Sequence, residues 1–110
     1  MLHRMKLQSA PFSAIKAGEK KVELRLYDEK RSCVNEGDMV EFTDLSTGET
    51  LVCRVGKIQR FASFEELYHC YDKRSLGYRE DEQALPQDML KYYSEEDIAR
   101  YGVVALELQI

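Results

Sequence analysis

The sequence predicts a small α+β domain with a mainly antiparallel, barrel-like sheet and short helices packed on it. Apolar and polar residues alternate over 22–26, as in a half-buried strand. Two further strand-like segments, around 39–42 and 51–58, flank a Ser-Thr-Gly turn, and helix-start signals occur at several points. The chain has 110 residues, the length of one domain, so we predict a single domain over 1–110.

The N-terminal part of the chain predicts a strand, a short helix and a second strand. The first strand ends at Leu7, and the helix opens with Ser9 or Ala10 near its cap and Pro11 in the first turn. Gly18 ends this helix, because glycine readily adopts the left-handed conformation that follows many helix ends. Along the strand 22–26, the apolar side chains share one face and the charged ones share the other.

The C-terminal part predicts three short helices and a final strand. A capping box at 63–66 starts one helix, Pro86 starts a second, and a serine with three acidic residues at 94–97 starts a third that ends at Gly102. The apolar segment 103–108 closes the chain as a strand. We expect this strand to pair with the first one and to close the sheet.

The cysteines and histidines predict neither a disulfide framework nor a metal site. The three cysteines are an odd number at wide spacing, there is no C-x-x-C, and His3 and His69 lie far apart in the sequence. We therefore expect no cofactor and no metal.

Composition and charge limit the partners. No apolar run approaches the roughly 18–20 residues that a bilayer requires, and the N-terminus lacks the apolar core of a secretion signal. We expect a cytoplasmic protein with no membrane partner.

The net charge is −4, with +2 on residues 1–60 and −6 on residues 61–110. Long duplexes usually require a strongly basic face, so small or short ligands fit better.

The most informative segment is a run of charged residues that follows the first helix. Gly18, Lys20, Glu23 and Arg25 form the pattern G-x-K-x-x-E-x-R. As physical chemistry alone, this is a helix-ending glycine followed by a strand with a polar face of alternating charge. The simpler interpretation is a solvated face whose Glu–Arg pair contributes about 0–1 kcal/mol.

The same pattern resembles the motif of the ASCH domain family, relatives of the PUA RNA-binding fold. The segment 34–42 resembles the family's next turn and strand. The stretch from Leu76-Gly77-Tyr78 to Val103-Val104 resembles that of small bacterial stand-alone members. The resemblance implies a PUA-like fold, a small β-barrel with short helices packed on it. It also implies a cleft beside the motif that binds RNA or nucleotides. Some members hydrolyse N4-acylated cytidine nucleosides, and others are ribonucleases.

The chemistry of the motif suits such a site. Gly18 leaves room for a ligand beside a sharp turn. Lys20 is the candidate base, nucleophile or anion ligand, and Glu23 is the candidate that orients Lys20 or transfers protons to a leaving amine. Arg25 offers a fork of donors to a phosphate or carbonyl oxygen. A structural ion pair is the alternative for each charged residue.

The sequence departs from the amidohydrolase members of the family at one position. Those members carry a threonine where this chain has Glu23, and they use it with the lysine and a later glutamate. Glu65, Glu66 and Glu80 are the candidates for that later acid.

Two tyrosines are candidates for stacking on a base. Tyr27 lies just past the motif, and Tyr78 follows a glycine in an irregular stretch. Core or rim packing is the alternative for both. The remaining tyrosines on helical stretches are interpreted as packing residues: Tyr68, Tyr71, Tyr92 and Tyr93.

The sequence thus favours binding of a nucleotide, a modified nucleoside or short single-stranded RNA through a cleft at Lys20, Glu23 and Arg25. The first alternative is an amidohydrolase that acts on N4-acylated cytidine or a related amide. A ribonuclease is another, and the acidic net charge keeps a non-nucleic-acid interaction module open.

Overall fold

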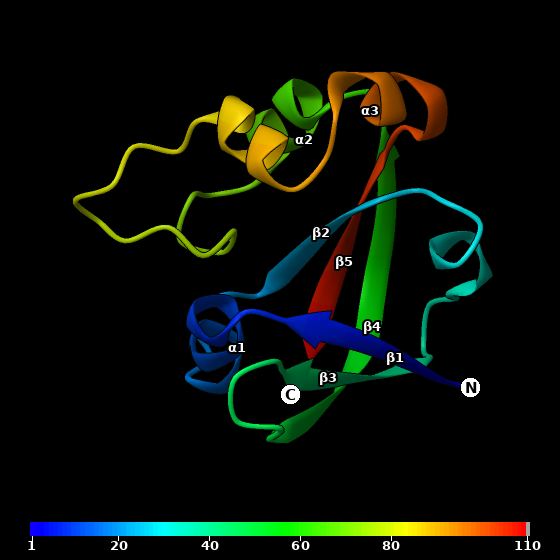
Figure 1. Cartoon of the computed structure of the whole chain (residues 1–110), viewed down its shortest axis with the longest axis vertical. Coiled ribbons are helices and arrows are strands. Elements are labelled where there is room, and N and C mark those ends of the chain that lie inside the picture. The colour runs from blue at the N-terminus through cyan, green and yellow to red at the C-terminus, as the bar shows by residue number, and fades with distance from the viewer. Residues whose placement is uncertain (110) are drawn as a thin grey trace.

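One curved five-stranded sheet organises the chain, whose computed structural model describes residues 1–109 (Figure 1). In chain order the elements are β1 (Leu2–Leu7), α1 (Ser9–Lys16), β2 (Val22–Leu26), the 3-10 helix η1 (Arg31–Cys33), β3 (Met39–Asp44), β4 (Thr50–Phe61), α2 (Phe64–Cys70), the 3-10 helix η2 (Pro86–Lys91), α3 (Glu95–Tyr101) and β5 (Val103–Gln109).

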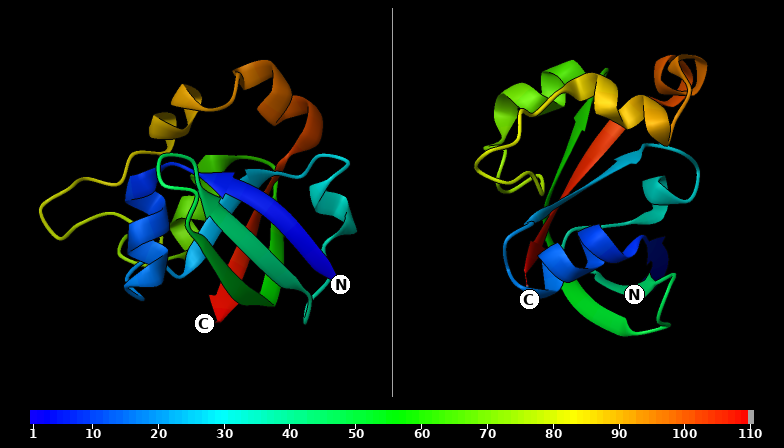
Figure 2. Two further views of the ribbon diagram at one scale, coloured as in Figure 1. Left: turned by 60° about the horizontal axis from the view of Figure 1, so that its bottom comes forward. Right: turned by 60° about the vertical axis from the view of Figure 1, so that its left-hand side comes forward.

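The sheet has the strand order β1-β3-β4-β5-β2, with β1 and β2 at its two edges. Only the β1–β3 pair is parallel, so the mainly antiparallel sheet is confirmed. The sheet curls into a half-barrel, as the two views in Figure 2 show. A register shift between Val55 and Ile58 of β4 adds to the curl, because a β-bulge bends its strand and increases the local twist.

The prediction that the first and last strands pair is wrong. Strand β5 forms hydrogen bonds with β4 along one edge and with β2 along the other. Neither edge of β5 is left for β1, which pairs instead with β3. The half-barrel therefore has an open side between β1 and β2.

Two apolar clusters occupy the two faces of the sheet. Alternation along β5 divides its residues, so that Val104 and Leu106 enter the first cluster and Val103 and Ala105 enter the second. The first cluster packs against α1, and the second packs against α2 and η2. The partners of Glu23 and Arg25 on β5 are Leu106 and Val104, so both charged residues lie on the face of the first cluster.

The helix termini largely follow the predicted signals. Gly18 follows the end of α1 with φ +79°, and Ser63 caps α2 by accepting a hydrogen bond from the Glu66 amide. The expected cap of α1 is wrong: Gln8 occupies the cap position without a side-chain bond, and Ser9 Oγ instead donates to Asp44 Oδ1 at 2.7 Å. The helix expected at Pro86 is a short 3-10 helix.

None of the helices within residues 1–109 combines the length and the apolar character that crossing a bilayer requires.

The contact between α1 and β3 makes stability depend on pH. The hydrogen bond from Ser9 and that from the Ser46 amide lower the pKa of Asp44. A carboxyl with a lowered folded-state pKa stabilises the fold above its unfolded pKa of about 3.9, and this contribution is lost as the pH falls through the folded value. We expect Asp44→Asn to melt at a lower temperature than the wild type at pH 7.

Circular dichroism melts from pH 7 to pH 2 test this expectation. The difference between the two proteins should shrink below about pH 4, because the asparagine does not titrate. Ser9→Ala should move the loss of stability to higher pH. A difference in melting temperature that stays constant down to pH 2 would contradict the assignment.

Candidate functional site

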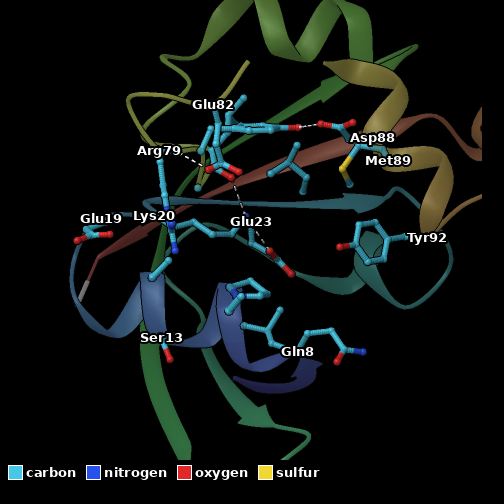
Figure 3. Close-up of a pocket in the computed structure, with 18 of the residues that line it drawn as sticks. Gln8, Ser13, Glu19, Lys20, Glu23, Arg79, Glu82, Asp88, Met89 and Tyr92 are labelled. Atoms are coloured by element: carbon cyan, nitrogen blue, oxygen red, sulfur yellow. Dashed lines mark hydrogen bonds and ion pairs between the residues drawn. The ribbon is translucent and has the colours of Figure 1, made fainter. Parts of the chain in front are cut away.

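A cleft of about 1230 Å³ opens on the side of the half-barrel where β2 forms the edge (Figure 3). Its walls come from α1, from β2, from the segment 74–82 and from the segment 88–93. In Figure 1 the segment 74–82 belongs to the long excursion between α2 and η2. Two regions that are about 50 residues apart in sequence, α1 with β2 and the two segments 74–82 and 88–93, therefore share one hollow.

Three charged side chains of the motif form a chain along one wall of this cleft. Lys20 Nζ lies 3.5 Å from Glu23 Oε1, and Arg25 Nε donates to Glu23 Oε2 at 2.7 Å. The exposed fractions of these side chains are 8% for Lys20, 6% for Glu23 and 14% for Arg25. The interpretation of this strand face as solvated is therefore wrong: the face is shielded, and it pairs two cations with one carboxylate.

Lys20 is also tied to the loop that forms the opposite wall. Its Nζ donates to the Leu76 carbonyl at 3.1 Å. The amides of Lys21 and Val22 both donate to the Ser75 carbonyl, which fastens the turn 75–77 to the start of β2. Gly77 has φ +104°, and a Cβ at this position would lie 3.1 Å from Lys20 Cδ. Glycine thus allows the turn to lie directly on the lysine stem.

Arg25 joins the two edges of the sheet. Its Nη2 donates to the Lys6 carbonyl of β1 at 2.9 Å, while its Nε holds Glu23. Among residues 1–109, no hydrogen bond is formed by the third guanidinium nitrogen, Nη1. The guanidinium therefore spans the open side of the half-barrel and keeps one nitrogen, Nη1, for a ligand.

Burial lowers the pKa of Lys20, and the negative charge of Glu23 partly offsets this effect. A lowered pKa increases the share of neutral amine near neutral pH, which is the form that acts as a base or nucleophile. In its charged form the same amine is an anion ligand. The geometry is compatible with both roles.

Tyr78 forms a polar cluster on the other wall of the cleft. Its hydroxyl lies 2.8 Å from the Tyr68 hydroxyl and 2.8 Å from Asp88 Oδ2. Burial, followed by these hydrogen bonds, raises the pKa of Tyr78, so the hydroxyl stays protonated and donates to Asp88. Figure 3 shows Asp88 on the wall opposite α1.

The structure brings some of the predicted site residues together and separates others. Lys20, Glu23, Arg25 and Tyr78 line the cleft, whereas Gly18 acts at the end of α1 and is not part of the lining. Tyr27 lies elsewhere: the guanidinium of Arg60 covers its ring at 3.8 Å from the centroid, and both residues line a separate hollow of about 330 Å³.

Of the three candidates for the later acid, one lies in the cleft and two lie outside it. Glu80 lines the cleft from the exposed loop. Glu65 and Glu66 lie on α2 outside the lining, and Glu66 Oε2 accepts from the Ala62 amide at the start of that helix. Asp88, which the sequence did not suggest, lies in the cleft instead.

Tyr92 is the other residue that the sequence analysis missed. We interpreted it as a packing residue, and this interpretation is wrong: it is 63% exposed and lines the cleft. The sequence Tyr92-Tyr93 does not indicate which of the two rings is exposed. Both residues lie just past a short 3-10 helix, so neither is assigned to a buried helix face.

No group of three His, Cys, Asp or Glu side chains within residues 1–109 is arranged to hold a metal ion.

The half-barrel with a charged cleft at its open edge defines a PUA-like α+β domain. A family model of the ASCH domain matches residues 5–110, and the chain therefore belongs to the ASCH domain family. Domains of this family are in general associated with RNA or resemble hydrolases. A search of curated proteins finds no significant match.

Solved structures share the fold over nearly the whole chain. The hypothetical protein PH0355 is 33% identical with a TM-score of 0.83, and the match covers 99% of this chain and 98% of that one. Protein PF0455 from Pyrococcus furiosus is 34% identical with a TM-score of 0.71, over 99% and 96%. The ASCH protein from Zymomonas mobilis is 15% identical with a TM-score of 0.71, over 99% and 67%, and it shares the fold.

The position of Gly77 leads to a testable expectation for Lys20. We expect Gly77→Ala and Gly48→Ala each to lower the free energy of unfolding by about 1 kcal/mol, because both glycines have positive φ. A Cβ at Gly48 has no atom within 4 Å, so only Gly77→Ala should also displace Lys20. The Cε resonance of Lys20 in carbon-13 NMR spectra reports the displacement. Equal shifts in both variants, or none in either, would contradict this contact.

Glu23 should be the residue on which the buried cations depend. We expect Glu23→Gln to lower the free energy of unfolding at pH 7 by about 3 kcal/mol, because removing one member of a buried ion pair leaves uncompensated charge. Glu19→Gln, an exposed change of the same charge, is the matched control and should have little effect.

The pH dependence of this variant adds a second test. Because Glu23 raises the pKa of Lys20, its removal should lower that pKa further below the ordinary value of about 10.4. At pH values between the lowered pKa of Lys20 in the folded state and its ordinary pKa in the unfolded state, the unfolded state binds more protons. The free energy of unfolding therefore rises with pH in this range. Urea unfolding at pH 7 and pH 10 should show Glu23→Gln recovering part of its deficit relative to the wild type. A deficit that grows with pH would exclude the assignment.

Proposed function

We propose that the cleft binds a nucleotide, a modified nucleoside or a short single-stranded RNA. The observation that carries this proposal is the placement of two shielded cations, Lys20 and Arg25, around one carboxylate in the wall of a hollow bordered by tyrosines. Arg25 keeps its Nη1 nitrogen for a phosphate or carbonyl oxygen, and Lys20 supplies a second cationic group.

The rest of the lining supports a ligand with a polar, planar part. Asp88 presents a carboxylate that already accepts a hydrogen bond from Tyr78, and its second oxygen has no hydrogen bond among residues 1–109. A base with an amino group can donate to such an oxygen. The acidic segment 80–82 on the rim disfavours a long phosphate backbone, in line with a short ligand.

An amidohydrolase is the second candidate, and the lowered pKa of Lys20 beside Glu23 is the observation that favours it. In this hypothesis the neutral Lys20 amine takes a proton from water, and the resulting hydroxide attacks the amide carbonyl. The C–N bond of the tetrahedral intermediate then breaks, and a proton passed through Lys20 and Glu23 neutralises the leaving amine. The threonine of the amidohydrolase members is absent, so the binding function is placed first.

Binding assays with Lys20→Met separate the cleft from the rest of the surface. We expect nucleotides and short single-stranded RNA to bind the wild type in a salt-sensitive manner, and Lys20→Met to bind about tenfold or more weakly, because a charged hydrogen bond contributes about 1.5–3 kcal/mol. Lys21→Met is the matched control, since Lys21 is exposed and follows directly in the sequence. Fluorescence anisotropy or calorimetry measures both. Unchanged affinity in Lys20→Met would overturn the proposal.

Hydrolysis is tested in parallel with N4-acetylcytidine, following cytidine release by chromatography. If Lys20 is the base, kcat/KM should rise with pH through a pKa below the ordinary lysine value of about 10.4, and Lys20→Met should abolish turnover. No turnover by the wild type, together with intact nucleotide binding, would leave the binding function alone.

A further inference from the structure

The side of the cleft away from Lys20 ends in an exposed aromatic ring. Tyr92 directly follows η2, lines the cleft and is 63% exposed. In Figure 3 it lies across the pocket from Lys20, with Glu23 between them. An aromatic ring that keeps this much contact with water at the rim of a charged hollow is a surface on which a planar group can stack.

The next residue, Tyr93, fixes the position of the segment that carries Tyr92. Tyr93 turns into the protein and stacks on Phe64, with ring centroids 6.0 Å apart and an angle of 17° between the planes. The rings of Tyr92 and Tyr93 lie 6.5 Å apart at 57°. The stacking of the partly buried Tyr93 ring on Phe64 thus anchors the segment that holds Tyr92 at the rim of the cleft.

Positive charge lies close to this ring. Lys91 precedes Tyr92 and also lines the cleft. Arg25 and Tyr93 both line this cleft as well. Arg25 has an Nη1 that forms no hydrogen bond among the described residues. An anionic group between the Lys20 side and the Tyr92 side would therefore meet a cationic donor.

The size of the cleft also exceeds that of one nucleoside. Sites for single small molecules measure about 300–1000 Å³, whereas this cleft measures about 1230 Å³. Its two sides offer different chemistry: buried Lys20 and Glu23 lie on one side, and Asp88, Lys91 and the exposed ring of Tyr92 lie on the other (Figure 3).

From these observations we infer that the cleft takes two successive nucleotides of a single-stranded RNA. The first base lies on the Lys20 side, the second base stacks on Tyr92, and the phosphate that joins them lies on Arg25. This inference rests on the proposed function and narrows it, because it names a dinucleotide unit instead of a free nucleoside as the preferred ligand.

The test compares cytidine monophosphate with the dinucleotide CpC in calorimetric titrations at one salt concentration. We expect the wild type to bind CpC about tenfold or more tightly than the monophosphate, as one base–aromatic stack provides. Tyr92→Ala should remove this advantage and leave the affinity for the monophosphate within about twofold. Tyr92→Phe should retain the advantage, because the ring and not the hydroxyl makes the stack.

Tyr101→Ala is the matched control. Tyr101 is also exposed, at 36%, but it lines the separate hollow near Tyr27, so this change should leave both affinities as they are. Equal affinities of the wild type for both ligands, or an equal loss for both in Tyr92→Ala, would overturn the inference and leave the proposed function standing. If neither ligand binds, both the dinucleotide inference and the proposed function are overturned.

Discussion

The carboxylate of Glu23 is the group on which the rest of the site depends. Lys20 and Arg25 both lie in the wall of the fold with little exposure to water. Two shielded cations without a partner would lose hydration and repel each other, at a cost of several kcal/mol. Each oxygen of Glu23 takes one of them, so the carboxylate neutralises part of the charge and also fixes where each cation lies.

Each cation then connects Glu23 to a different part of the fold. Lys20 reaches the Leu76 carbonyl, which belongs to the turn between α2 and η2. Arg25 reaches the Lys6 carbonyl at the other edge of the sheet. The three side chains therefore form a continuous polar connection from the loop wall to β1. A change at Glu23 acts on the stability of the half-barrel and on the cleft at the same time, because the same contacts serve both.

The local features of the fold could be predicted because they depend on neighbours in the sequence. Alternation located β2, the Ser-Thr-Gly turn located the β3–β4 hairpin, and Gly18 marked the end of α1. The pairing of β1 could not be predicted in this way. A strand with an apolar face is compatible with several partners, and both edges of β5 are occupied by β4 and β2 in the folded chain. Likewise, the Ser9 hydroxyl does not cap the helix but donates a hydrogen bond to Asp44, a residue 35 positions away.

For the site, the sequence by itself determined which residue types stand at the motif, and the fold places Lys20, Glu23 and Arg25 in the wall of one cleft. Only the tertiary structure decided that these charges are shielded, that Tyr78 and Asp88 face them, that Tyr27 lies elsewhere and that Tyr92 is exposed. The physical reason is that burial and the facing wall of a cleft are set by contacts between distant segments. The identity of a side chain limits what it can do, and its surroundings in the folded chain select which of those possibilities it has.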